Sequence, residues 1–349
     1  MIINIIYPSS HHRTGGVVVL YEWANALARR GHEVHFIHGP RTEYRINDLG
    51  ELPPFRFEDE VRHHIVDALD DPGPPDGDIV MFAPGAPRRL GLEVGVVQGH
   101  RMFTEEIERD LFRVPAPKVC VASWLVDVGL GYGVPGEQLW YVPLGIDHEV
   151  FALRTPLDAR PVDVAMLFHP HREKGYRVGL AALEELLARR PGLQAVVFGM
   201  NRPGKRPPGA VRYVQGATHR ELADQVYNAT RVFMQPSNHE GFGYTAVEAM
   251  ACGCALVSTD NGGSRDYALP GETALVVPPG DAAGLAACVE RLLDDDELRI
   301  RLATAGERHV RKFDWDVSAE MLETFFERYL ADPDRYRRPP GDEVVEEVG

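Results

Sequence analysis

The chain has 349 residues, a formal net charge of −15, and a composition that is 44% hydrophobic. This length suits two domains of about 150 to 180 residues each, because single hydrophobic cores stop growing near 250–300 residues. The negative charge argues against nonspecific binding to nucleic acid or to an anionic membrane surface, since both attract basic proteins. No apolar run approaches the ~20 residues of a membrane-spanning helix, so we expect no transmembrane segment.

The four cysteines are too few and too scattered to form a disulfide framework. A predicted strand begins at Ile2, which leaves no room for a signal peptide ahead of the fold. Cys252-Gly253-Cys254 lacks the second cysteine pair of a metal site, so we expect no metal. Together these features predict a cytoplasmic protein, a monomer or weak dimer, without a nucleic-acid partner.

The first part of the chain alternates short apolar runs with one helical pattern. The helix is indicated by Leu20, Trp23 and Leu27 at helical spacing, and Gly31 is its expected stop. Residues 40–78 show weak periodicity and predict no element. Strands are predicted at 2–7, 34–37, 79–83, 94–97 and 118–122. This alternation predicts an α/β domain over 1–152, with 153–161 as a linker.

A second α/β series follows the linker and predicts a domain over 160–315. Its elements are strands at 162–168, 195–198, 232–235 and 255–258, helices at 176–190 and 220–228, a helix carrying Glu248, and amphipathic segments at 281–293, 295–311 and 316–330. We expect the helix of 316–332 to join the first domain and 333–349 to be a flexible acidic tail. Ligands of such sheets bind beyond the carboxyl ends of the strands, so two facing domains would enclose a substrate in a central cleft.

Two glutamates flank a Gly-Phe-Gly turn at a predicted helix start: Glu240 precedes the turn, and Glu248 lies inside the helix. The amides of Phe242, Gly243, Tyr244 and Thr245 are among those that a helix start leaves without partners, which favours an anion. Gly241 and Gly243 allow close backbone approach. Glu248 lies roughly 6 Å along the helix, a suitable offset from a phosphate to a ribose. The block predicts a site for a diphosphate and hydroxyl groups.

Two further segments fit a phosphate. Arg172 and Lys174 follow the strand at 162–168, where a fork and a point charge suit a diphosphate leaving group. Gly15-Gly16 follows the first strand but lacks the full dinucleotide fingerprint. It indicates either a tight strand-to-helix turn or close approach of the backbone to a phosphate or sugar.

These segments, in this order, resemble the family-4 retaining glycosyltransferases of the GT-B fold, which has two Rossmann-like domains. The resemblance is carried by Thr14-Gly15-Gly16, 142–151, Lys174-Gly175, 240–253, Asp260-Asn261-Gly262-Gly263 and 274–279. It spans nearly the whole chain, and the pair of glutamates separated by seven residues, Glu240 and Glu248, is its most specific part.

The resemblance implies a nucleotide-diphosphate sugar as donor, transfer of a hexose with retention, and no metal or other cofactor. Glu240 would bind hydroxyls of the donor sugar, Glu248 the ribose, and Gly241 to Thr245 the sugar and diphosphate. Lys174 would neutralise the leaving phosphate, which helps to deprotonate the acceptor hydroxyl. The acceptor itself, whether a small molecule, a glycan or a lipid-linked group, is not indicated.

Two positions depart from the family pattern. His169 stands where an arginine is usual, so either Arg172 substitutes for it or the site carries less charge. The usual histidine of the first domain appears as Gln98, with His100 two residues on, and either side chain could face the acceptor. The alternatives are a nonenzymatic nucleotide-sugar-binding protein and a nucleotide-sugar epimerase of the same fold. An epimerase needs an acid–base pair that the sequence does not reveal.

Overall fold

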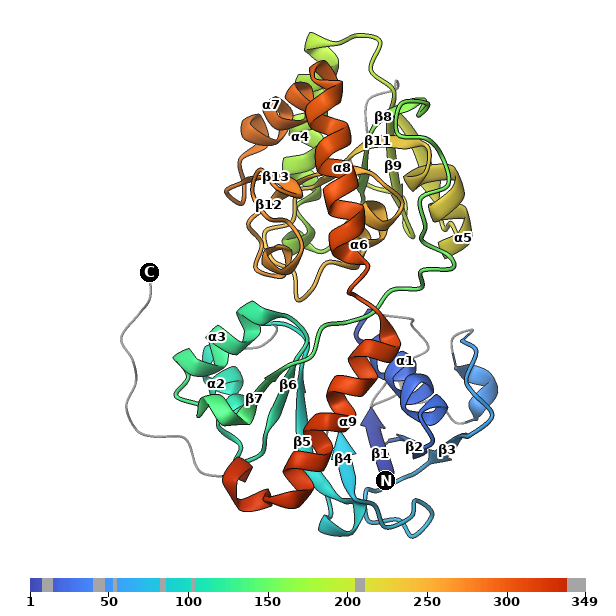
Figure 1. Cartoon of the computed structure of the whole chain (residues 1–349), viewed down its shortest axis with the longest axis vertical. Helices are drawn as coiled ribbons and strands as arrows, with labels where there is room; N and C mark the ends of the chain where they lie inside the picture. The colour runs from blue at the N-terminus through green and yellow to red at the C-terminus, as the bar shows by residue number, and fades with distance from the viewer. Residues whose placement is uncertain are drawn as a thin grey trace. The chain divides into compact units, whose positions relative to one another are not determined.

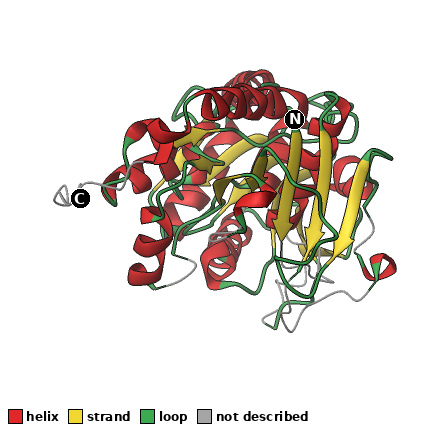
Figure 2. Ribbon diagram, turned by 90° about the horizontal axis from the view of Figure 1, so that it is seen from below, coloured by secondary structure: helices red, strands yellow, loops and turns green. Residues whose placement is uncertain are grey.

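A computed structural model describes residues 1–7, 15–39, 48–52, 55–81, 86–101, 104–204 and 211–337. The chain divides into two compact units (Figure 1). The first unit contains Met1–Gly145 together with Trp315–Gly349, and the second contains Ile146–Asp314. Each unit is an α/β structure in which helices lie against the strands (Figure 2).

The described strands of the first unit form one parallel sheet in the order β3-β2-β1-β4-β5-β6-β7. Their bounds are β1 (Ile2–Tyr7), β2 (Glu33–His38), β3 (Val61–Ile65), β4 (Ile79–Met81), β5 (Leu92–Val97), β6 (Lys118–Cys120) and β7 (Leu139–Tyr141). The strand order reverses between β1 and β4, which is the point where doubly wound sheets bind their ligands. The central strands β1 and β4 are almost fully buried apolar runs, as strands covered on both faces should be.

Two long helices of the first unit pack against each other although they lie at opposite ends of the chain. The unit's helices are α1 (Gly15–Arg29), α2 (Glu105–Arg113), α3 (Ser123–Gly131) and α9 (Trp315–Ala331). The indole of Trp23 on α1 donates a 2.7 Å hydrogen bond to Ser318 Oγ on α9. Arg29 of α1 also forms a 2.8 Å ion pair with Asp316. These contacts hold the last helix in the first unit.

The second unit repeats the strand order of the first, as β10-β9-β8-β11-β12-β13. Its strands are β8 (Val162–Leu167), β9 (Ala195–Gly199), β10 (Val211–Gln215), β11 (Thr230–Gln235), β12 (Ala255–Thr259) and β13 (Ala274–Val277). Its helices are α4 (Tyr176–Arg189), the short α5 (His219–Glu221), α6 (Tyr244–Ala251), α7 (Ala282–Asp294) and α8 (Asp296–Val310). The order reverses between β8 and β11, so the loops after these two strands flank the expected ligand position.

The first unit differs from the sequence prediction in several parts, since α2, α3 and β7 had no predicted counterpart. The 40–78 segment contains the edge strand β3, whose sequence Val-Arg-His-His-Ile lacks an apolar run because the strand is only half covered. The flexible tail was predicted to begin at 333, but Pro333–Arg337 forms a 3₁₀ turn in which Tyr336 is buried. The rest of that predicted tail, 338–349, lies outside the described residues.

Two histidine pairs join β3 to β2. His38 Nε2 lies 2.8 Å from His63 Nδ1, and His35 Nδ1 lies 2.8 Å from His64 Nε2. The first pair packs against the rings of Phe36 and Phe57. Burial, together with neighbouring histidines, lowers the pKa of His38 to about 3 and that of His63 to about 4.

These pairs predict a loss of stability in mild acid. Because the folded-state pKa values of His38 and His63 lie below the ordinary value near 6.5, the unfolded chain binds protons first as the pH falls. We expect the first unit to lose about 2–4 kcal/mol of unfolding free energy between roughly pH 6.5 and pH 4. Urea unfolding across this range measures the loss. The double variant His38→Phe, His63→Leu should flatten the profile, and an unchanged profile would contradict the prediction.

Candidate active site

The second unit brings together the lysine and the first glutamate predicted from sequence. Lys174 Nζ lies 2.6 Å from Glu240 Oε2 in an ion pair. The other oxygen of the carboxylate, Oε1, accepts a 2.8 Å hydrogen bond from Ser237 Oγ. The Glu240 side chain is 6% exposed and that of Lys174 is 32% exposed. The carboxylate is therefore buried and held in place, whereas the lysine side chain is partly open to solvent.

This meeting follows from the topology, because Lys174 lies in the loop after β8 and Glu240 in the loop after β11. Lys174 ends a 3₁₀ turn, Arg172–Lys174, and the next residue, Gly175, adopts a left-handed conformation with φ of 62°. The carbonyl of Glu173 accepts the backbone N–H of Asn238 at 2.7 Å. A Cβ atom on Gly175 would lie 1.8 Å from the carbonyl oxygen of Pro236. The two loops therefore lie in direct backbone contact, and glycine is required there.

The Gly-Phe-Gly turn leads into α6 through a left-handed Gly243, with φ of 104°. A Cβ atom there would lie 2.2 Å from Tyr267 Oη, and that hydroxyl donates a 3.3 Å hydrogen bond to Gln235 Oε1. Burial and the nearby charge of Glu240 raise the pKa of Tyr267 well above its usual value. The amide of Ala246 donates to the Gly243 carbonyl at 3.1 Å, so the amides before it belong to the helix start that attracts anions.

A second loop holds this turn in place. The amide of Glu240 donates to the Asn261 carbonyl at 2.9 Å, and the amide of Gly263 donates back to the Glu240 carbonyl at 3.2 Å. A Cβ atom on Gly263 would lie 2.4 Å from the Phe242 carbonyl oxygen. The Phe242 ring is buried, 5.2 Å from the ring of Phe313, so this residue can offer a ligand only its backbone.

Glu248 lies on the inner side of α6 and is buried. Its Oε2 accepts a 3.0 Å hydrogen bond from the hydroxyl of Tyr227. Burial, and after it the negative charge of Glu248, raises the pKa of Tyr227 well above the ordinary value. The tyrosine therefore stays a donor and orients the carboxylate. Tyr244 and Thr245, in the first turn of the same helix, are half-buried.

Two residues near Lys174 differ from it: Arg172, which was expected to add positive charge, and His169, which stands where the family has an arginine. Arg172 is exposed, and within the described ranges its guanidinium makes no ion pair. The His169 side chain is exposed near Lys174, and partial desolvation, Lys174 and His171 lower its pKa against the opposing effect of Glu240. The imidazole is therefore uncharged near pH 7, and Lys174 is the cation in contact with the carboxylate.

The predicted residues of the first unit lie at the carboxyl ends of β1 and β5. Gly15 and Gly16 begin α1, and the Gly16 carbonyl accepts a 3.1 Å hydrogen bond from Gln98 Nε2. A Cβ atom on Gly16 would lie 2.3 Å from Gln98 Oε1, so the glycine makes room for this side chain. Thr14 lies outside the described residues. The Gln98 side chain is thus held by its hydrogen bond to the glycine turn.

His100 lies two residues further and contacts a carboxylate that sequence reasoning missed. Its Nδ1 lies 2.6 Å from Oε2 of Glu108, whose side chain is 6% exposed. Glu108 belongs to α2, whose four acidic and two basic residues are typical of a solvated helix surface. Ser237 and Tyr227 were also missed, because a single polar residue gives no distinctive signal in the sequence.

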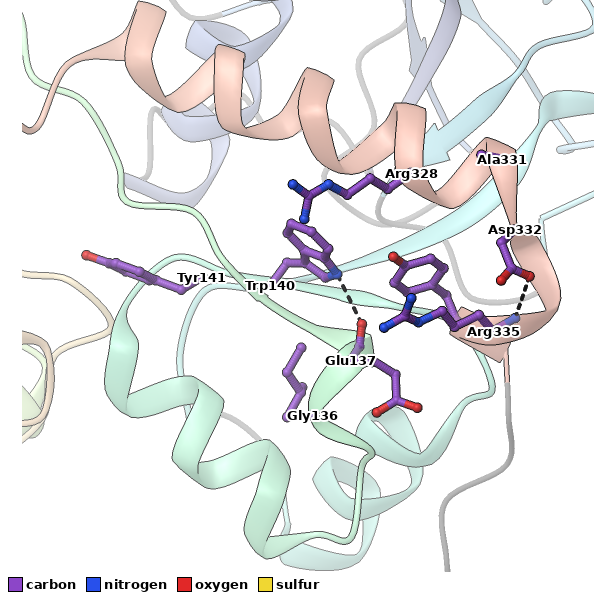
Figure 3. A pocket seen from close by; sticks show the side chains of 10 residues that line it. Gly136, Glu137, Trp140, Tyr141, Arg328, Ala331, Asp332 and Arg335 are labelled. Carbon is purple, nitrogen blue, oxygen red and sulfur yellow. Dashed lines mark hydrogen bonds between the residues drawn. The ribbon is translucent and has the colours of Figure 1, made fainter.

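A cavity in the first unit lies elsewhere (Figure 3). It has a volume of about 590 Å³ and lies between the β7 edge and the end of α9. The guanidinium of Arg328 lies 5.5 Å from the Trp140 ring centre, and that of Arg335 lies 5.7 Å from the centre of Tyr336. None of the predicted site residues lines it.

The described part of the chain contains no cluster of three or more His, Cys, Asp or Glu side chains arranged to hold a metal ion. None of the described helices is both long and apolar enough to cross a membrane.

The chain is similar to known proteins of one family. Residues 158–309 match the family model described as glycosyl transferases group 1. A phosphatidyl-myo-inositol mannosyltransferase of Mycolicibacterium smegmatis is 32% identical over 206 residues. That match covers 54% of this chain and only about half, 52%, of the relative. A protein of the same name from Mycobacterium tuberculosis is 32% identical over 371 residues, covering 94% of this chain and 97% of the relative.

Solved structures agree on the fold. The structure of Anabaena Alr3699/HepE in complex with UDP-glucose superposes with a TM-score of 0.70 at 15% identity, covering 94% of this chain and 100% of that one. Both sheets of the present chain have the strand order of doubly wound folds. With a relative matched along nearly its whole length, the chain belongs to the glycosyl transferases of group 1 and has the GT-B fold.

Proposed function

We propose that this protein is a retaining, metal-independent glycosyltransferase that moves a hexose from a nucleotide-diphosphate sugar to an acceptor hydroxyl in the cytoplasm. The observation that carries the proposal is the Lys174–Glu240 pair beside the start of α6. A fixed carboxylate, a solvent-reaching ammonium and a helix start provide partners for hydroxyl groups and for a diphosphate in one place.

Each group has a separate task in this proposal. Glu240 accepts hydrogen bonds from hydroxyls of the donor sugar, and Glu248, oriented by Tyr227, accepts those of the ribose. Lys174 and the helix start stabilise the negative charge that develops on the diphosphate as the bond to the sugar breaks. The acceptor oxygen bonds to the anomeric carbon on the face that the diphosphate leaves, and its proton passes to the leaving phosphate.

The relatives supply context for the donor. The Anabaena structure is a complex with UDP-glucose, and the mycobacterial relatives are named as mannosyltransferases acting on phosphatidyl-myo-inositol. Both names fit a nucleotide-activated hexose as donor. The acceptor of this chain stays open among small molecules, glycans and lipid-linked groups.

The test is a donor panel of UDP-, GDP-, ADP- and TDP-hexoses. A donor at 100 times its dissociation constant should raise the unfolding free energy by about 2.7 kcal/mol, visible as a higher melting temperature. We expect one donor to stabilise the protein and to be slowly hydrolysed or transferred. Stabilisation without turnover would favour a nonenzymatic sugar-binding protein, and release of the epimeric nucleotide sugar would favour an epimerase. No response to any donor would contradict the proposal.

A further inference from the structure

The first unit contains a buried histidine–carboxylate contact that the donor site does not use. His100 follows β5, and its Nδ1 lies 2.6 Å from Oε2 of Glu108 on α2. The side chains are 18% and 6% exposed, so both groups are largely removed from solvent. Burying a carboxylate is costly unless a charged or hydrogen-bonding partner compensates it.

Glu108 lies on the buried side of α2. On α2, Glu108 and Phe112 lie four residues apart and are both buried, whereas Glu105 and Glu106 are exposed. The Phe112 ring lies 5.3 Å from that of Tyr132. A glutamate on the apolar side of a helix is unusual, and at this position it reaches His100.

Aromatic rings enclose the histidine on other sides. The ring centres of Trp124 and Tyr132 lie 6.0 and 6.1 Å from that of His100, both in edge-on orientation. The imidazole is therefore held by rings from the α3 region and by a carboxylate from α2. Nδ1 lies against the carboxylate without a well-aligned hydrogen bond, and Nε2 is the nitrogen that remains to meet a ligand.

The position of the loop makes such a ligand reasonable. His100 lies at the carboxyl end of β5, two residues after Gln98, which contacts the glycine turn after β1. Ligands of doubly wound sheets bind beyond this edge. The loop after β5 therefore carries Gln98, which is hydrogen-bonded to the glycine turn, and His100, which lies against the buried carboxylate of Glu108.

We propose that Glu108 is a positioning residue: it holds the Nδ1–H of His100 so that Nε2 accepts a hydrogen bond from a sugar or acceptor hydroxyl. This inference rests on the proposed glycosyltransferase function and adds a residue to its site. A carboxylate that fixes the tautomer and orientation of a histidine is a recurrent arrangement in enzyme sites.

The alternative is a purely structural role, in which the His100–Glu108 ion pair only holds the loop after β5 against α2. Both readings predict some loss of stability on substitution, so stability alone cannot separate them. They differ in the imidazole tautomer and in turnover. Glu108→Gln tests both, because glutamine keeps the size of the side chain and can place either its oxygen or its amide group against Nδ1.

The matched control is Glu105→Gln. Glu105 lies on the same helix, is exposed, and pairs with Arg109 at 2.6 Å. The first measurement is the ¹⁵N spectrum of the His100 ring across a pH series, in which the neutral form shows its tautomer. The parent protein and Glu105→Gln should show a protonated Nδ1, and Glu108→Gln a mixture of tautomers. An unchanged tautomer in Glu108→Gln would overturn the inference.

The second measurement is turnover with the donor found in the panel. We expect Glu108→Gln to lower kcat by about 10- to 100-fold with the donor KM within twofold, and Glu108→Asp to restore part of the loss. An equal loss in donor hydrolysis without acceptor assigns Nε2 to the donor sugar, and a loss confined to transfer assigns it to the acceptor. An unchanged kcat with an altered tautomer would reduce Glu108 to a structural role and overturn the inference.

Failure of the proposed function looks different. In that case the unaltered protein itself shows no turnover with any donor, and this inference falls with it. If only the positioning role is wrong, the unaltered protein turns over its donor and Glu108→Gln does so at the same rate.

Discussion

Glu240→Gln should lower the rate of sugar transfer by about 10³-fold while leaving nucleoside diphosphate binding as tight as before, or tighter. The carboxylate is buried and held by Ser237 and Lys174, so its oxygens have fixed positions. Glutamine keeps the shape and the acceptor for Ser237 but removes the charge. The transferring sugar then loses its strongest acceptor, and Glu240→Ala should lose transfer as well.

The binding part of this prediction comes from Lys174. Its ammonium lies 2.6 Å from the carboxylate in the free chain, so a diphosphate must compete with Glu240 for it. Neutralising Glu240 leaves the ammonium to the phosphates. Because the Lys174 side chain is 32% exposed and solvent screens the pair, the gain in affinity should be at most about 10-fold. Lys174→Met should instead weaken diphosphate binding, and it should also slow transfer.

Calorimetric titration with the diphosphate of the preferred base, together with initial rates, measures both effects. Glu272→Gln is the matched control, because Glu272 is an exposed glutamate of the same unit and should change neither quantity. Full transfer activity in Glu240→Gln would remove this residue from the site. A parallel loss of diphosphate binding would show that Glu240 supports the loop rather than the sugar.

The sequence predicts the central strands well because they are buried on both faces. The runs at Ile2 and Val162 contain consecutive apolar residues, and both form inner strands of parallel sheets. Edge strands were missed for the opposite reason. The β3 segment is polar, and it is held by backbone pairing with β2 and by two histidine contacts across 25 and 29 residues of chain, which no local pattern encodes.

The segment with Glu240 and Glu248 was predicted to bind a donor because glycine spacing and carboxylates appear together in one short stretch. Sequence reasoning did not find that Lys174 and Glu240 touch, because they lie 66 residues apart. Their contact depends on β8 and β11 being neighbours at the reversal of strand order. Glu108 was missed for another reason: an acidic residue among other charges on a helix is usually solvated, and only tertiary packing turns this one inward.

Gly175→Ala should lower the stability of the second unit far more than a glycine-to-alanine change elsewhere, and should displace Lys174. Gly175 has φ of 62°, and an added Cβ would lie 1.8 Å from the Pro236 carbonyl oxygen and 2.6 Å from its carbon. Both neighbours are backbone atoms, so the loops after β8 and β11 must separate. We expect a cost of about 2–5 kcal/mol, the sum of left-handed strain and overpacking.

Gly216→Ala is the matched control. Gly216 belongs to the same unit and has φ of 64°, but a Cβ there would meet nothing within 4 Å. It should therefore cost only the strain of the left-handed conformation, about 1–2 kcal/mol, and leave donor binding unchanged. Urea unfolding and diphosphate titration of both variants measure the difference. Gly175→Ala should also lose about 10²-fold in transfer, since a shift near 1 Å in a catalytic group has that effect. Equal stability of the two variants would show that the loop contact yields without cost, and the close approach of Gly175 to Pro236 would then not be what holds Lys174 beside Glu240.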